Sequence, residues 1–202
     1  MGRKAVDVVL LPDDAMTDKA IEANKELVEK SGEKIALNKQ DCLPHISLAM
    51  GCVDEGDITS VGQVLKTIAE KTTLFELRVI GVQTTTNSVG EKVSVFEVEK
   101  TGELQSLHEE VMGQLGPYLS HDVTRDMLYS SGEIGESTLL WIKNYRDKSG
   151  FANFFPHITI GYGQIENGPF PIRFAASQLA LCHLGNHCTC RKILASVRLK
   201  TA

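Results

Sequence analysis

The sequence predicts an α+β protein whose strands mostly pair antiparallel. Apolar, β-branched stretches occur alongside stretches in which apolar residues recur at helical spacing, so both element types are present. Several of the strands are neighbours along the chain and are joined by short turns, as antiparallel strands are. These two observations favour the α+β class over a doubly wound parallel sheet.

The chain opens with a strand, a helix and a second strand. Residues 5–11 are apolar and β-branched, which is typical of a strand. Asp13 or Asp14 can cap the helix that follows, and Gly32 is expected to end it. Another strand is expected over residues 43–50.

The middle of the chain predicts a helix, a hairpin and another helix. Asp57 is a suitable cap for a helix whose apolar stripe runs to Ile68, and a hairpin is expected over residues 75–98. Apolar residues at helical spacing over 104–115 predict the next helix, which Gly116-Pro117 closes.

The last part of the chain predicts one short helix and three strands. Residues 138–145 are expected to form the helix, with Ser137 as its cap. A strand over 155–162 follows, and a long hairpin over 173–199 turns at Gly185-Asn186.

One short pattern occurs twice: proline, histidine, apolar, hydroxyl, apolar. It stands at residues 44–48 (PHISL) and again at 156–160 (PHITI), in both cases on a predicted strand. Side chains alternate between the two faces of a strand, so each histidine shares a face with the hydroxyl two residues later. The apolar residues face the other way and root the strand in a core.

The four polar residues of the two copies suit acid–base chemistry on a phosphate ester. His45 and His157 are imidazoles, which both give and take protons near neutral pH. The hydroxyls of Ser47 and Thr159 can donate to the oxygens of a phosphate. Two such strands facing each other would form a cleft that holds all four groups.

This pair of motifs resembles the signature of the two-histidine (2H) phosphoesterase superfamily, which repeats His-apolar-[Ser/Thr]-apolar. The first copy carries serine where threonine is commoner. The resemblance implies one domain over residues 1–202, made of two intertwined lobes. It also implies a bilobal α+β fold, with two mostly antiparallel sheets related by a pseudo-two-fold axis, outer helices and a central cleft.

The same resemblance implies a metal-independent phosphodiesterase that uses no cofactor. Its substrates would be cyclic phosphates or 2',5' linkages of nucleotides or RNA ends. His45 and His157 would be catalytic, and Ser47 and Thr159 would bind phosphate. The sequence leaves open which histidine is the base and which the acid. We also expect Tyr162 to share the face of the second motif, where stacking on a base and packing at the rim are equal alternatives.

Composition limits the partners. The net charge is −5, which excludes a generic nucleic-acid binder and favours small substrates or RNA ends. Five basic residues and no acidic residue follow Glu166, which is equally consistent with a local positive field that steers a phosphate ligand and with a pair of strands whose basic faces are solvated. We expect a monomer with no obligatory protein partner and no membrane association.

The cysteines bear on location. There are five, an odd number at irregular spacing, and we expect reduced thiols in the cytoplasm. The start of the chain has only a brief apolar run, too short for a signal peptide, and reads as the first strand.

Two other functions remain open at this stage. A binding module could hold a nucleotide or RNA end in the same cleft without turnover. A zinc-dependent protein could be built around a late cluster formed by Cys182, His183, His187, Cys188 and Cys190.

Overall fold

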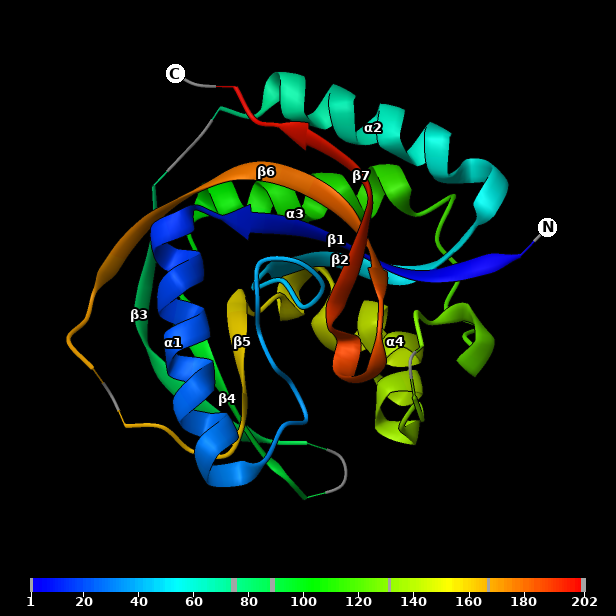
Figure 1. Ribbon diagram of the computed structural model, residues 1–202. Helices are drawn as coiled ribbons and strands as arrows, with labels where there is room; N and C mark the ends of the chain where they lie inside the picture. Colours follow the sequence, from blue (N-terminus) through cyan, green and yellow to red (C-terminus); the bar gives the residue numbers. More distant parts are fainter. Residues whose placement is uncertain (1, 74–75, 88–89, 131, 167, 201–202) are drawn as a thin grey trace.

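The computed structural model describes residues 2–73, 76–87, 90–130, 132–166 and 168–200. Seven strands and four α-helices are found in these residues (Figure 1). The strands are β1 Arg3–Pro12, β2 Ile46–Asp54, β3 Glu76–Thr86, β4 Lys92–Val98, β5 His157–Tyr162, β6 Ile172–Leu184 and β7 Cys190–Arg198. The helices are α1 Asp14–Ser31, α2 Ile58–Lys71, α3 Gly102–Leu115 and α4 Glu136–Ser149. The predicted α+β class is confirmed.

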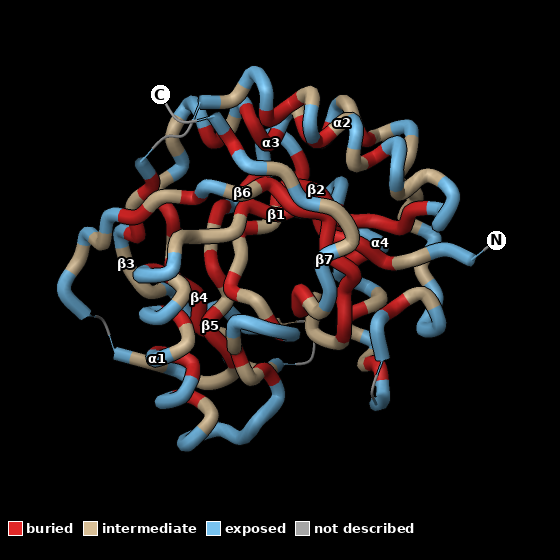
Figure 2. Tube along the Cα trace, turned by 45° about the horizontal axis from the view of Figure 1, so that its top comes forward, coloured by how far each residue is buried: buried red, intermediate tan, exposed pale blue. Residues whose placement is uncertain are grey.

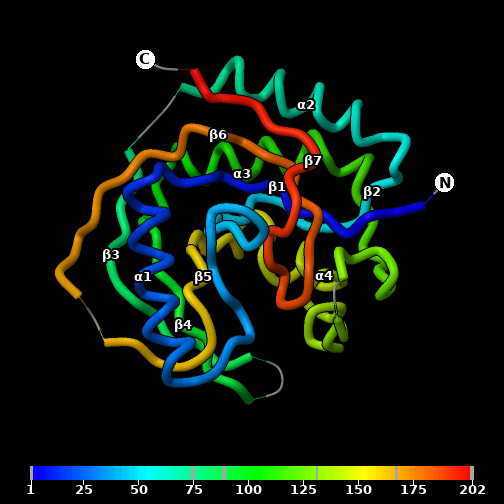
Figure 3. Tube along the Cα trace, viewed as in Figure 1, coloured from blue at the N-terminus to red at the C-terminus, as the bar shows by residue number. Residues whose placement is uncertain are grey.

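All pairings between the strands are antiparallel, and they join the strands into one large sheet. The order is β1-β2-β5-β4-β3-β6-β7, and β6 also pairs with β1, so six strands form a closed ring of pairings (Figure 3). Strand β6 pairs with β3 through Ile172–Ala175 and with β1 through Ala176–His183. The two expected sheets are therefore joined into one continuous sheet, because β6 pairs with both β1 and β3.

The two motif strands meet at equivalent residues. Strand β2 pairs with β5 where Ile46 lies opposite Ile158, and each of these residues directly follows its motif histidine. Antiparallel strands that pair at equivalent positions are related by a local two-fold axis between them. The order of elements is also similar, because β1-α1-β2 and β4-α3-α4-β5 both end on a motif strand, the second with α4 as an additional helix.

The helices of the two repeats are exchanged. Helix α1 packs on β5, and α3 packs on β2, so each covers the motif strand of the other repeat (Figure 1). Asn24 of α1 donates from Nδ2 to the Ile160 carbonyl at 2.7 Å, and Nδ1 of His108 on α3 lies 2.8 Å from the Leu48 carbonyl. Both carbonyls belong to the third residue after a motif histidine, so equivalent contacts hold the two strands.

The other two helices cover the outside of the sheet. Helix α2 lies against β7 and α3, and α4 lies against β2 (Figure 1). Each amphipathic helix buries one apolar stripe, as in Val61, Leu65 and Ile68 of α2. None of the helices in the described part of the chain has both the length and the apolar composition needed to cross a bilayer.

The core follows the sheet around its ring. Figure 2 shows buried residues along β1, β2 and the second half of β6, where residues 179–184 are all buried. Strand β1 is buried at every position from Ala5 to Leu10, because β2 and β6 flank it and other elements cover both its faces. Asp7 lies in this run with 0% exposure and is the one carboxylate among the buried residues that the structure describes.

The expectation of five reduced cysteines is wrong for one pair. Cys182 of β6 and Cys190 of β7 form a disulfide, because these strands pair and bring the two side chains together. Cys42, Cys52 and Cys188 are free thiols. The disulfide removes two thiolates from the late cluster that could otherwise have held zinc.

Several element bounds differ from the sequence expectation: β2 begins at Ile46 and β5 at His157, each a few residues later than expected. Strand β2 continues past Met50 to Asp54, because β1 pairs with it along its length. Helix α4 begins at Glu136 and runs to Ser149, several residues longer than expected. The first residue of the expected central hairpin, at position 75, lies outside the described residues.

The contacts of Asn24 predict a large stability effect. Its buried amide donates from Nδ2 to the carbonyls of Ile35 and Ile160, and its Oδ1 accepts from the Leu37 N–H. Asn24→Ala leaves three buried backbone groups without partners, so we expect the free energy of unfolding to fall by about 3 kcal/mol. Urea denaturation measures this. The exposed neighbour Lys25 provides the control, since Lys25→Ala should change stability by less than about 0.5 kcal/mol. Equal stability of the two variants would contradict the role of this amide.

Candidate active site

The structure confirms the predicted alternation in both motifs. His45 and Ser47 are partly exposed on one face of the first motif, and His157 and Thr159 are partly exposed on one face of the second. The apolar residues between and after them have 0% exposure and root each strand in the core: Ile46, Leu48, Ile158 and Ile160.

The pairing register brings the four polar residues together. Because Ile46 lies opposite Ile158, continuing the antiparallel register places His45 beside Thr159 and Ser47 beside His157. The two histidines then occupy opposite corners of one small face. Cross-strand diagonals of this kind span about 7–8 Å, which leaves room for a phosphate group between the rings.

Both imidazoles are held in the same way. Nδ1 of His45 lies 2.7 Å from the Leu43 carbonyl, and Nδ1 of His157 lies 2.8 Å from the Phe155 carbonyl. A carbonyl oxygen only accepts, so Nδ1 carries the proton in each neutral ring. Nε2 therefore has a free lone pair on both histidines. Each motif proline stands between the carbonyl and the histidine, where its fixed φ restricts the backbone.

Burial makes both imidazoles poor bases in the resting protein. It lowers the pKa of His45 to about 4; the bond to the Leu43 carbonyl opposes this effect, and the charge of His157 adds to it. Burial also lowers the pKa of His157. Both rings are therefore neutral at pH 7. A bound phosphate brings negative charge, which favours protonation of one ring.

A fifth residue, missed in the sequence, lies under this face. Asp7 of β1 is fully buried, and its Oδ2 is 2.5 Å from Ser47 Oγ and 3.7 Å from His45 Nε2. Burial raises the pKa of this carboxyl well above its usual value, although a hydrogen bond donated by Ser47 to the ionised form opposes the shift. The signal in the sequence was a single carboxylate inside an apolar strand.

The sequence matches the family model described as the 2'-5' RNA ligase superfamily over residues 29–185. The chain belongs to this superfamily. The resemblance of its paired motifs to the 2H phosphoesterases is thereby confirmed, and the protein is of the phosphoesterase type. No curated protein matches the sequence.

Solved structures share the fold of this superfamily member. TT0787 of Thermus thermophilus matches with a TM-score of 0.65 and 16% identity over 98% of each chain. E. coli LigT in its apo form matches with a TM-score of 0.52 and 13% identity over 99% of each chain. LigT complexed with ATP gives 0.55 and 14%, over 98% of this chain and 99% of LigT. These likenesses concern the fold.

Tyr162 lies near the motif face through a bulge in its strand. Strict alternation would place the Tyr162 side chain on the other face of the strand from His157. The pairing of β5 with β4 skips Ile160, however, and shifts the alternation by one residue. The Tyr162 hydroxyl is 2.8 Å from Nδ1 of His187, and Lys34 Nζ lies 4.9 Å from the ring centroid. The ring therefore contacts two basic side chains.

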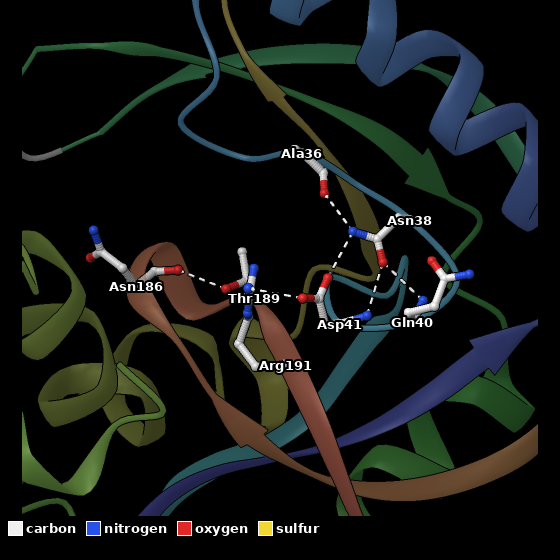
Figure 4. Close-up of polar contacts among 7 residues, drawn as sticks. All are labelled: Ala36, Asn38, Gln40, Asp41, Asn186, Thr189 and Arg191. Carbon is white, nitrogen blue, oxygen red and sulfur yellow. Dashed lines mark hydrogen bonds and ion pairs between the residues drawn. The ribbon is translucent and has the colours of Figure 1, made fainter. Parts of the chain in front are cut away.

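A cavity of about 210 Å³ lies beside these contacts in this member of the superfamily. Its lining includes the cations Lys34 and Arg191, which pair with Glu91 and Asp41, and one acidic residue, Glu133. Figure 4 shows how Arg191 of β7 reaches Asp41 in the loop between α1 and β2, at 3.4 Å. The cavity thus lies between that loop, the β6–β7 turn and the segment that precedes α4, which contributes residues 129, 130 and 132–134.

The β6–β7 turn carries backbone strain. His187 and Cys188 both have left-handed φ values, 58° and 55°. The Asn186 side chain accepts from the Gly135 N–H and the Thr138 hydroxyl, which ties the turn to the start of α4. Two consecutive residues in this conformation cost of order 1–3 kcal/mol each and persist only where the surroundings enforce them. Here the enforced conformation directs His187 to Tyr162.

The low pKa of His45 predicts its titration. NMR of the imidazole should give a pKa of about 4, against about 6.5 in the unfolded chain. Because the unfolded chain binds this proton more tightly, His45 makes folding less favourable as the pH falls from about 6.5 toward 4. The His45→Asn variant should therefore lose less stability than the wild type between pH 6.5 and pH 4, as measured by urea denaturation. A pKa at or above 6.5 would contradict the burial of this ring.

Proposed function

We propose that this protein is a metal-independent phosphodiesterase that hydrolyses cyclic phosphates or 2',5' linkages of nucleotides or RNA ends. The observation that carries the proposal is the pair of imidazoles anchored alike, each with Nε2 free, at opposite corners of one face. Cleavage of a phosphodiester needs one group that takes a proton and another that gives one. Two histidines on either side of one phosphorus meet both needs.

The proposed reaction assigns each motif residue a role. One histidine takes a proton from the attacking water through Nε2, and the other, protonated, gives its proton to the departing ribose oxygen. The hydroxyls of Ser47 and Thr159 donate to the non-bridging oxygens, where charge must be held in the transition state. His45 and His157 exchange roles when the reaction runs in the other direction.

The cavity beside Tyr162 would hold the rest of the substrate. Lys34 and Arg191 would exchange their carboxylate partners, Glu91 and Asp41, for a second phosphate, and Tyr162 would bind the base or ribose as a substrate-binding residue. E. coli LigT has been crystallised with ATP, with NADP+, with 3'-AMP and with phosphate, all of which carry phosphate groups. That protein's ligands support a nucleotide as the substrate class here.

Removal of either imidazole should abolish most of the activity. His45→Ala and His157→Ala are each expected to lower kcat/KM on 2',3'-cyclic AMP by about 10²–10⁴-fold, the usual contribution of a positioned acid or base. The assay follows the product by ³¹P NMR with EDTA present.

His121 provides the control for this experiment, since it belongs to neither motif. His121→Gln should keep kcat/KM within about threefold. Full activity of both alanine variants would end the proposal, and saturable binding of 2',3'-cyclic AMP and 2',5'-linked dinucleotides without product would favour the binding module.

The motif hydroxyls should stabilise the negative charge on the non-bridging oxygens of the phosphate. Thr159→Val keeps the shape of the side chain but removes its donor, so kcat/KM is expected to fall about 10–100-fold. Thr159→Ser should restore most of the loss, since the first motif already carries serine at the equivalent position. Steady-state kinetics of the three proteins decide this, and equal activity of the valine and serine variants would remove the hydroxyl from the mechanism.

A further inference from the structure

Asp7 is a buried carboxyl group that belongs to neither motif. It lies on β1 with 0% exposure, and its Oδ2 is 2.5 Å from Ser47 Oγ. Its Oδ1 is buried and has no hydrogen-bond partner among the described residues. His45 Nε2 lies 3.7 Å away, beyond hydrogen-bond distance. The carboxyl group therefore contacts the proposed site through one hydroxyl.

The surroundings of Asp7 favour its neutral form. Strand β6 contributes Cys182 opposite it, whose sulfur is in a disulfide. Burial raises the pKa of Tyr145 on α4 and of Cys188 in the β6–β7 turn, and a charge on Asp7 would raise both further, so both groups are uncharged. His45 of the first motif is neutral as well. An ionised carboxylate here would be a buried charge with one hydrogen bond and no cation beside it, which is costly.

We propose that Asp7 is a positioning residue that, as a neutral acid, donates its O–H to Ser47 Oγ and so directs the Ser47 proton to the phosphate. A carboxylate at the same place would accept from Ser47 instead, and the hydroxyl would then be lost as a donor to the substrate. This inference rests on the proposed function, because it assigns Ser47 to phosphate. It adds a third strand, β1, to the two that carry the motifs.

The protonation state of Asp7 can be tested without turnover. An ionised carboxylate 3.7 Å from Nε2 would hold the pKa of His45 higher by more than about 1 pH unit. Asp7→Asn has the same shape and no charge. NMR titration should therefore give His45 pKa values within about 0.3 pH unit of each other in the wild type and Asp7→Asn. A fall of 1 pH unit or more in the variant would overturn the proposal.

The link through Ser47 needs a second measurement, the binding of inorganic phosphate by calorimetry. The Asp7→Asn variant can donate from Nδ2, so its phosphate affinity should stay within about threefold of the wild type. Asp7→Leu cannot donate and should weaken phosphate binding about 10-fold. In a Ser47→Ala background, Asp7→Leu should have no further effect. Equal weakening by Asn and Leu, or the same 10-fold loss without the Ser47 hydroxyl, would overturn the proposal.

These two measurements separate the failure of the inference from the failure of the proposed function. Both use binding or titration of the whole protein, whereas the proposed function is judged by product formation. If the wild type forms no product, but the His45 titrations agree and the phosphate affinities follow the expected order, the role of Asp7 stands and the phosphodiesterase does not. If the wild type forms product, but the titrations or the phosphate affinities depart from the expected values, the phosphodiesterase stands and the role of Asp7 is rejected.

Discussion

The contact between β2 and β5 is the constraint on which the rest of the site depends. Ile46 and Ile158 pair across this contact, and each is fully buried directly after a motif histidine. Because side chains alternate along a strand, burying these two isoleucines forces both histidines to the opposite face. A slip of one residue in this register would turn one imidazole into the core. The hydrophobic effect thus fixes which side chains face the proposed site.

The exchanged helices hold this contact in place. Asn24 and His108 reach from α1 and α3 to the motif strands of the opposite repeats, and both are buried. A buried polar group needs its partners, so these bonds restrict how far the strands can move apart. The same logic extends to the β6–β7 turn, where Asn186 fixes a strained backbone beside the cavity. Rigid support of this kind is what a two-group proton transfer requires.

Period-two patterning made the motif faces, the strands and the α+β class predictable, and the paired motifs pointed to the superfamily. Features set by contacts between distant segments were not predictable. The disulfide depends on the pairing of β6 with β7, and the position of Tyr162 depends on a bulge at Ile160. Asp7 gave a readable signal, an acidic residue in an apolar strand, but its hydrogen bond to Ser47 follows from the β1–β2 register.

In the proposed mechanism, two imidazoles that are distant in sequence act on one phosphate. A crystal structure of the protein with bound inorganic phosphate tests it most directly. We expect Nε2 of His45 and Nε2 of His157 to lie within about 2.6–3.2 Å of oxygens of the same phosphate. A phosphate in the cleft that contacts only one of the two rings, or neither, would contradict the account.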